Sequence, residues 1–207
     1  VQRPKDFRRV LVCLDRYIRI RAGFSHRCSR QARARGRTVT HASATPVTDR
    51  QRVYAYFGAD GLMCVDKAGQ LLWKRAEPMF VGKYGVGTSL VLKNNILVVI
   101  SDVGASSGMA SAIMVFDATS GNPLWRTERA SHKAYAAYGT PALASSNGRD
   151  IVVVQGWQGV NGYDLQTGEE DWSFPADSEG KHLVASPLCH GDRLFLADAK
   201  QLRALDL

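Results

Sequence analysis

The chain has 207 residues, of which 45% are hydrophobic and 22% charged, a composition typical of a globular domain. It contains no apolar run near the ~18 residues that a membrane-spanning helix needs, and its first residues do not read as a signal peptide. The formal net charge is +8, but residues 1–40 hold 12 Lys/Arg against 2 Asp/Glu, whereas residues 41–207 hold 15 against 17. The basic character therefore belongs to one segment, and the rest of the chain is nearly neutral.

Residues 8–15 (RRVLVCLD) predict a short apolar strand that ends in an aspartate. Residues 16–40 then carry eight Arg and no acid, without the period of 2 or 3.6 that would support a strand or an amphipathic helix. Three interpretations stay open for this irregular segment: a solvated basic loop, a nucleic-acid-binding arm, and a stretch that is not native coding sequence but a shifted reading frame. We do not expect nucleic acid to be the partner.

From His41 onward the sequence repeats a unit of four short apolar runs separated by Gly/Asp turns, which predicts antiparallel strands. The third run of each unit ends in an aspartate, and a Gly turn then leads to a strand with a tryptophan. The copies read CVDKAGQLLW (64–73), VFDATSGNPLW (115–125) and YDLQTGEEDW (163–172).

The repeat aspartates are spaced by about 40–50 residues, as in a β-propeller blade. We therefore predict an all-β propeller of four-stranded antiparallel blades, with about four blades present. The predicted blades are residues 41–75, 87–127, 139–174 and, incomplete, 185–207.

Each repeat position has a predicted structural role. The aspartate accepts hydrogen bonds from turn N–H groups, glycine supplies a positive φ, and tryptophan docks between neighbouring blades with its indole N–H on a turn carbonyl. The residues assigned to this docking are Asp66, Trp73, Asp117, Gly121, Trp125, Asp164, Gly168 and Trp172. A Thr or Ser before a Pro or Leu marks the entry to each first strand, at Thr45, Ser89, Thr140 and Ser186.

The Asp-x-x-Thr-Gly-x-x-x-Trp unit of residues 164–172, with its near copy in 117–125, resembles the tryptophan-docking repeat of pyrroloquinoline-quinone (PQQ)-type β-propellers. Residues 41–207 as a whole resemble the bacterial PQQ-like repeat proteins. That superfamily also holds quinoprotein dehydrogenases and the propeller lipoprotein of the outer-membrane assembly machinery. The resemblance implies a periplasmic or otherwise extracytoplasmic protein with seven or eight blades, of which this chain would be a fragment.

The predicted topology places the segments before each first strand and the second hairpins on one face. We expect that face to bind a protein or small-ligand partner. Its candidate residues are His41, Tyr84, Tyr135, Tyr138, Trp157 and His182. The alternative is that these side chains only cap strand ends.

Quinoprotein dehydrogenases, which this chain resembles in its blades, carry an adjacent cysteine pair and a calcium site. The four cysteines here (Cys13, Cys28, Cys64 and Cys189) are not adjacent and have no metal-ligand spacing, so we interpret them as small apolar residues. We therefore expect a non-catalytic scaffold with no catalytic residue, metal or cofactor. The alternative is a degenerate quinoprotein dehydrogenase fragment that binds PQQ and calcium; a second alternative is an Arg-rich nucleic-acid-binding module.

Overall fold

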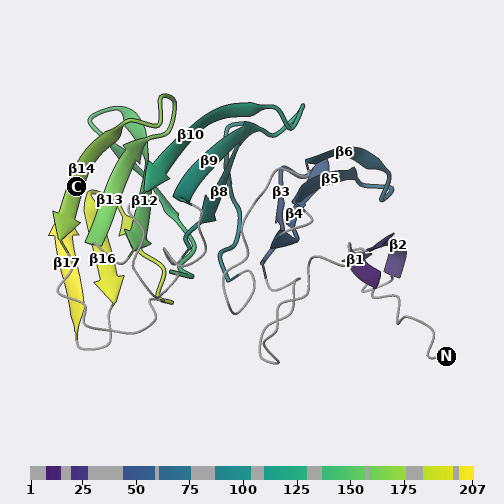
Figure 1. Ribbon diagram of the computed structural model, residues 1–207, viewed down its shortest axis with the longest axis horizontal. Helices are drawn as coiled ribbons and strands as arrows, with labels where there is room; N and C mark the ends of the chain where they lie inside the picture. Colours follow the sequence, from purple (N-terminus) through teal and green to yellow (C-terminus); the bar gives the residue numbers. More distant parts are fainter. Residues whose placement is uncertain are drawn as a thin grey trace.

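The computed structural model describes the chain in separate stretches, and for the first two of them only the backbone. These stretches are residues 8–14, 20–27, 44–58, 61–75, 87–103, 110–129, 137–156, 159–175, 184–197 and 201–207. They consist of strands joined by turns (Figure 1).

The stretches from residue 44 onward form four antiparallel sheets in which the strands lie side by side in chain order. The first sheet contains β3 (Val47–Thr48), β4 (Arg52–Tyr56), β5 (Leu62–Asp66) and β6 (Leu71–Arg75). The second contains β7 (Val91–Lys93), β8 (Ile96–Ser101), β9 (Ser111–Asp117) and β10 (Pro123–Arg129). The third contains β11 (Ala142–Ser146), β12 (Arg149–Gly156), β13 (Gly159–Asp164) and β14 (Glu170–Pro175). The fourth contains β15 (Leu188–His190), β16 (Arg193–Ala197) and β17 (Leu202–Asp206). The predicted all-β fold of antiparallel blades is confirmed.

A two-stranded hairpin precedes these sheets. β1 (Arg8–Leu14) pairs with β2 (Ile20–Arg27) in an antiparallel register that runs from Arg8↔Arg27 to Leu14↔Ile20. The prediction of an irregular segment over residues 16–40 is therefore wrong for residues 20–27. A ladder is made by backbone groups, so the short apolar alternation of Ile20, Ala22 and Phe24 is sufficient for a paired strand.

Neighbouring sheets pack face to face through buried apolar side chains. Leu97 of β8 joins a cluster with Tyr54 of the first sheet, whereas the next residue, Val98, joins a cluster with Val152 of the third sheet. Leu194 of the fourth sheet packs in the same way against the third. Successive residues of a strand point to opposite faces, and both faces of a middle sheet are covered. The unbroken apolar run of β8 follows from this burial.

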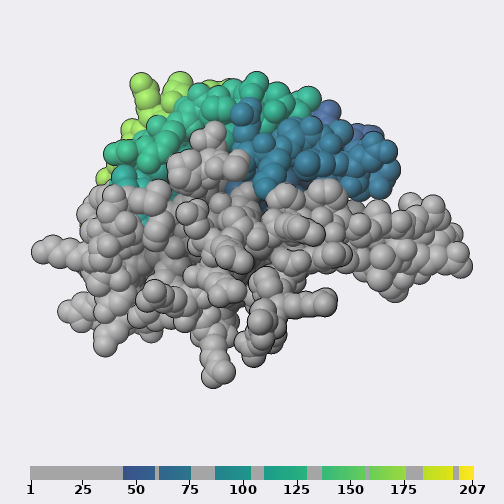
Figure 2. All heavy atoms as spheres, turned by 45° about the vertical axis from the view of Figure 1, so that its right-hand side comes forward, coloured from purple at the N-terminus to yellow at the C-terminus, as the bar shows by residue number. Residues whose placement is uncertain are grey.

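The sheets follow one another in chain order across the molecule (Figure 1), and the first strands of successive sheets lie close together, β3 with β7 and β11 with β15. The first sheet (blue) and the second sheet (teal) lie directly against each other in the space-filling view (Figure 2). Antiparallel order brings the ends of the second and fourth strands of each sheet to one side. We call this side, with the strand ends at residues 56, 75, 101, 129, 156 and 175, the loop face, and the opposite side, with the repeat aspartates, the Asp-turn face.

Candidate partner-binding face and the ties between sheets

The repeat aspartates close the turns after the third strands. Asp164 Oδ1 accepts hydrogen bonds from the backbone N–H groups of Gln166 and Thr167, at 2.8 and 2.9 Å. Asp66 and Asp117 do the same in their own turns. The Thr167 amide makes the largest contribution to holding the pKa of Asp164 below its ordinary value. These carboxylates thus have a structural role, as acceptors for the N–H groups of their own turns.

The turns after Asp117 and Asp164 each receive a tryptophan from the preceding sheet. Trp73 Nε1 donates to the carbonyl of Ala118 at 3.0 Å, and Arg75 Nε donates to the carbonyl of Gly121 at 2.7 Å. The indole lies so close to Gly121 that a Cβ there would be 2.6 Å from Trp73 Cδ2. Gly121 also has a φ of 71°, so the turn needs glycine for two separate reasons.

The next pair of sheets repeats this contact, which we call the Trp clasp. Trp125 Nε1 donates to the carbonyl of Leu165 at 3.1 Å, and Thr127 Oγ1 donates to the carbonyl of Gly168 at 2.7 Å. A Cβ at Gly168 would lie 2.5 Å from Trp125 Cε3. Successive sheets are therefore joined by the same local geometry.

Trp172 belongs to the same repeat position. It faces Gly162 of the neighbouring strand, where a Cβ would lie 2.3 Å from Trp172 Cε2, and it packs against the apolar cluster between the third and fourth sheets. In all three sheets the register of the outer strand shifts beside the tryptophan, which marks a β-bulge. The bulge re-aims the strand where the indole leaves its own sheet.

A second series of ties joins the entries to the first strands. The backbone N–H of Thr45 donates to Ser89 Oγ at 2.9 Å, that of Ser89 donates to Thr140 Oγ1 at 3.1 Å, and that of Thr140 donates to Ser186 Oγ at 2.9 Å. Each hydroxyl thus accepts from the amide at the same position in the preceding sheet. The Thr and Ser residues that mark these entries in the sequence carry this hydrogen-bond series.

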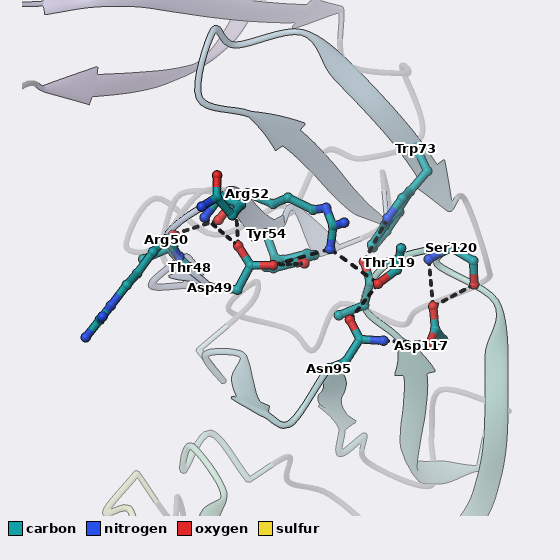
Figure 3. A network of polar contacts seen from close by, with 12 residues as sticks. Thr48, Asp49, Arg50, Arg52, Tyr54, Trp73, Asn95, Asp117, Thr119 and Ser120 are labelled. Carbon is teal, nitrogen blue, oxygen red and sulfur yellow. Dashed lines mark hydrogen bonds and ion pairs between the residues drawn. The ribbon is translucent and has the colours of Figure 1, made fainter.

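On the Asp-turn face, side chains join the first and second sheets (Figure 3). Arg52 Nη1 donates to Thr119 Oγ1 at 3.3 Å, and Thr119 in turn donates to Asn95 Oδ1 at 2.7 Å. At the first-sheet end of this series, Asp49 accepts hydrogen bonds from the Arg52 backbone N–H at 2.6 Å and from Tyr54 Oη at 2.9 Å. Burial raises the pKa of Tyr54 to about 12, so this phenol stays a donor at physiological pH.

Lys93 makes the corresponding link from the second sheet to the third. Its Nζ lies 2.5 Å from Asp150 Oδ1 and 3.3 Å from Ser145 Oγ. In each inter-sheet hydrogen bond named so far, the donor belongs to the earlier sheet and the acceptor to the later one. The ties therefore have one direction along the chain.

A buried ion pair on the loop face has no counterpart in our sequence predictions. Arg129, at the end of β10, pairs with Asp102, just after β8, and the two side chains are 5% and 9% exposed. Arg129 Nε also donates to Tyr163 Oη of the third sheet at 3.3 Å, and a Cβ at Gly156 would lie 2.6 Å from Arg129 Nη2. Burial raises the pKa of Asp102, while the guanidinium acts in the opposite direction. This pair fixes two strand ends beneath the loop face.

Among the residues predicted for the partner face, the structure describes Tyr138. Its ring lies over Gly87 of the preceding repeat, where a Cβ would be 2.6 Å from Tyr138 Cδ1. The other predicted residues of this face lie outside the described stretches: His41, Tyr84, Tyr135, Trp157 and His182. Their part in a common surface stays a prediction.

The described stretches hold no group of three or more His, Cys, Asp or Glu arranged to bind a metal ion. No helix in them is long and apolar enough to cross a bilayer. Cys64 is buried and Cys189 is partly buried, and both are free thiols whose pKa is raised by burial.

Residues 109–207 match the family model of outer membrane protein assembly factor BamB. The crystal structure of BamB from Moraxella catarrhalis is similar with a TM-score of 0.56 at 18% identity, over 79% of this chain and 46% of that one. The quinohemoprotein alcohol dehydrogenase from Comamonas testosteroni is similar with a TM-score of 0.60 at 11% identity, over 94% of this chain and 36% of that one. A comparison with curated protein sequences finds no match.

These likenesses show the fold: the four antiparallel sheets match part of a PQQ-type β-propeller. At identities this low, the two structures do not assign an activity, because one fold hosts many functions. The chain spans less than half the length of either structure.

Proposed function

We propose that this chain is a propeller scaffold that holds a protein partner in an extracytoplasmic compartment and carries out no reaction of its own. The observation that carries the proposal is the match of residues 109–207 to a family model named for an outer-membrane assembly factor. The ties between sheets support it, since Trp clasps, hydroxyl acceptors and charged links hold neighbouring sheets in a fixed arrangement. A surface fixed in this way loses little conformational entropy when it binds.

The proposed contact surface is the loop face. Tyr138 contributes a large amphipathic side chain that is already packed over Gly87, and aromatic residues of this kind are enriched at protein interfaces. The buried Asp102–Arg129 pair holds the strand ends under this face. The proposed face therefore has a fixed base.

Site-specific photo-crosslinking tests the proposal. A photoreactive amino acid is placed at Tyr138 and, separately, at Tyr84 of the predicted face. The matched controls are Arg50 and Lys67, which are exposed on the Asp-turn face. After irradiation in cells that express the protein, crosslinked products are identified by mass spectrometry. We expect one defined protein to be captured from the loop-face positions and not from the controls.

Equal capture from both faces, or none from the loop face, would contradict the proposed surface. The non-catalytic assignment has a separate test, titration with PQQ and calcium. Saturable binding together with dye-linked alcohol oxidation would replace the scaffold by the dehydrogenase alternative.

A further inference from the structure

The chain contains five asparagines, and two of them precede a glycine: Asn147–Gly148 and Asn161–Gly162. Glycine has no Cβ, so its backbone nitrogen can come close to the side chain of the preceding asparagine without a steric obstacle. From the different surroundings of these two pairs, we propose that Asn147 is a site of spontaneous deamidation and that the third sheet protects Asn161 from the same reaction.

The reaction needs only the chain and water. The Gly148 backbone nitrogen attacks Asn147 Cγ and loses its proton, and the Cγ–Nδ2 bond breaks. The leaving NH2 group takes up one proton and departs as ammonia, which produces a five-membered succinimide. Water then opens the ring at one of its two carbonyls. One product is aspartate, and the other is isoaspartate, in which the backbone runs through Cγ. No electrons are exchanged with an outside reagent.

Asn147 lies in a turn, outside the paired part of its hairpin. It occupies the two-residue turn between β11 and β12, beyond the last ladder pair, Ser146↔Arg149. Asn147 has a φ of 51° and Gly148 a φ of 74°, as in the type I′ turns that favour Asn-Gly. Both residues are exposed, and a Cβ added to Gly148 would meet nothing within 4 Å. The turn can therefore reach the attacking geometry without opening a sheet.

Asn161 has the opposite surroundings. It lies in β13, a central strand in which Gly162 pairs with Val153 on one side and with Trp172 on the other. The Trp172 indole also closes the space over Gly162. The Gly162 nitrogen can reach Asn161 Cγ only after the strand leaves both ladders, and core strands open rarely.

The remaining asparagines serve as internal references. Asn122 precedes Pro123, whose nitrogen carries no hydrogen and cannot form the succinimide. Asn94 occupies the equivalent turn of the second sheet, but the next residue is Asn95, whose side chain is bonded to Asp117 and Thr119 at 2.8 and 2.7 Å. Exposure in a turn is thus shared by Asn94 and Asn147, and glycine follows only Asn147.

The modification would act on the link between the second and third sheets. Ser145 and Asp150, which hold Lys93, form the ladder pair next to Ser146↔Arg149. Isoaspartate at position 147 adds one backbone atom and one negative charge to this hairpin. We expect the thermal midpoint of the isoaspartate form to fall below that of the unmodified protein.

The test is a time course on the purified full chain in mildly alkaline buffer, followed by proteolysis and mass spectrometry. Deamidation is read as a mass gain at each asparagine, and isoaspartate is assayed with an isoaspartate-specific methyltransferase. A parallel sample is kept in denaturant. We expect Asn147 to react at least about tenfold faster than Asn161 in the native sample, because core strands open far less often than turns. In denaturant the two rates should be similar.

Two variants sharpen the result. Asn147→Asp carries the new charge without the extra backbone atom. It should show no mass gain at position 147 and should accumulate isoaspartate more slowly, because its ring closure must expel water instead of ammonia. Asn95→Gly creates an Asn-Gly pair in the equivalent turn and should make Asn94 reactive. The proposal is overturned if native Asn147 stays intact while the denatured sample reacts, or if Asn161 reacts as fast as Asn147 in the folded protein.

Discussion

At the scale of single residues, the contact between sheets depends on the absence of a side chain. Gly121 and Gly168 each provide a positive φ and a bare surface on which the indole of the preceding sheet rests. The donor on the indole and the acceptor in the turn fix the angle of approach. Both partners recur at constant positions in the repeat, so a sequence motif can predict where such contacts lie.

Gly168→Ala should destabilise the protein more than Gly148→Ala. The two glycines have φ values of 77° and 74°, but only Gly168 lies against Trp125. Both substitutions carry the left-handed penalty of about 1–2 kcal/mol, and Gly168→Ala adds an overpacking cost of about 1–3 kcal/mol. Chemical denaturation measures the difference in unfolding free energy. Equal losses for the two variants would show that the indole contact contributes nothing.

The turn aspartates predict a loss of stability in acid. Backbone hydrogen bonds lower the folded-state pKa of Asp117 and Asp164 from the ordinary value of 3.8. The folded protein therefore binds these protons less readily than the unfolded chain, so the stabilisation is full above that value and disappears as the pH falls through the lowered pKa.

We expect the thermal midpoint to fall in that acidic range, and Asp164→Asn to flatten the fall. Calorimetry from neutral to acidic pH measures both curves. Parallel curves for the variant and the original protein would mean that Asp164 does not contribute to the pH dependence.

At the scale of elements, two strand ends of the loop face are held by the Asp102–Arg129 ion pair, which is not part of the sequence repeat. Asp102 and Arg129 are 27 positions apart, and neither recurs at the equivalent place in the other sheets. The apolar runs and turn motifs specify strands and neighbours because they report local backbone preferences and burial. A single long-range ion pair leaves no such periodic signal, so the sequence does not indicate it.

The strand β2 is likewise hard to predict from the sequence, because its pairing is made by backbone groups. Its apolar residues, Ile20, Ala22 and Phe24, alternate over only five positions, yet the strand pairs with β1 from Ile20 to Arg27. The partner face is the part of the prediction that depends most on residues outside the described stretches. Only Tyr138 of that set can be placed, through its contact with Gly87.

Breaking the buried pair should be costly. Arg129→Met and Asp102→Asn each leave one polar partner buried without its counter-charge, and we expect each to cost about 3–5 kcal/mol. The double variant should cost much less than the sum, because it removes both charges. Urea denaturation of the four proteins gives the coupling energy. Additive losses would show that the two side chains do not act as a pair.

At the scale of the whole molecule, the contacts described between sheets join neighbours in the chain. The apolar clusters join the first sheet to the second, the second to the third, and the third to the fourth. In such an arrangement, stability is approximately a sum of terms for repeats and for interfaces between neighbours. Changes at different interfaces should therefore be independent.

Trp73→Phe and Trp125→Phe test this independence. Each removes one indole donor bonded to a turn carbonyl and should cost about 1–2 kcal/mol. The two clasps share no partner, so the double variant should lose the sum to within about 0.5 kcal/mol. Differential scanning calorimetry and urea titration provide the values. A large coupling between the clasps would mean that the second sheet transmits strain from one interface to the other.

The single direction of the inter-sheet hydrogen bonds has a consequence for how such a protein can gain repeat units in evolution. A unit that offers donors on one side and acceptors on the other already fits a copy of itself placed next in line. Tandem duplication of its coding segment would create the new interface at the same moment as the new unit, with no complementary mutation required. Later divergence could then replace individual partners, such as Arg52 with Thr119 between the first and second sheets and Lys93 with Asp150 between the second and third. The packing of indole on glycine, common to both interfaces, would keep the copies aligned.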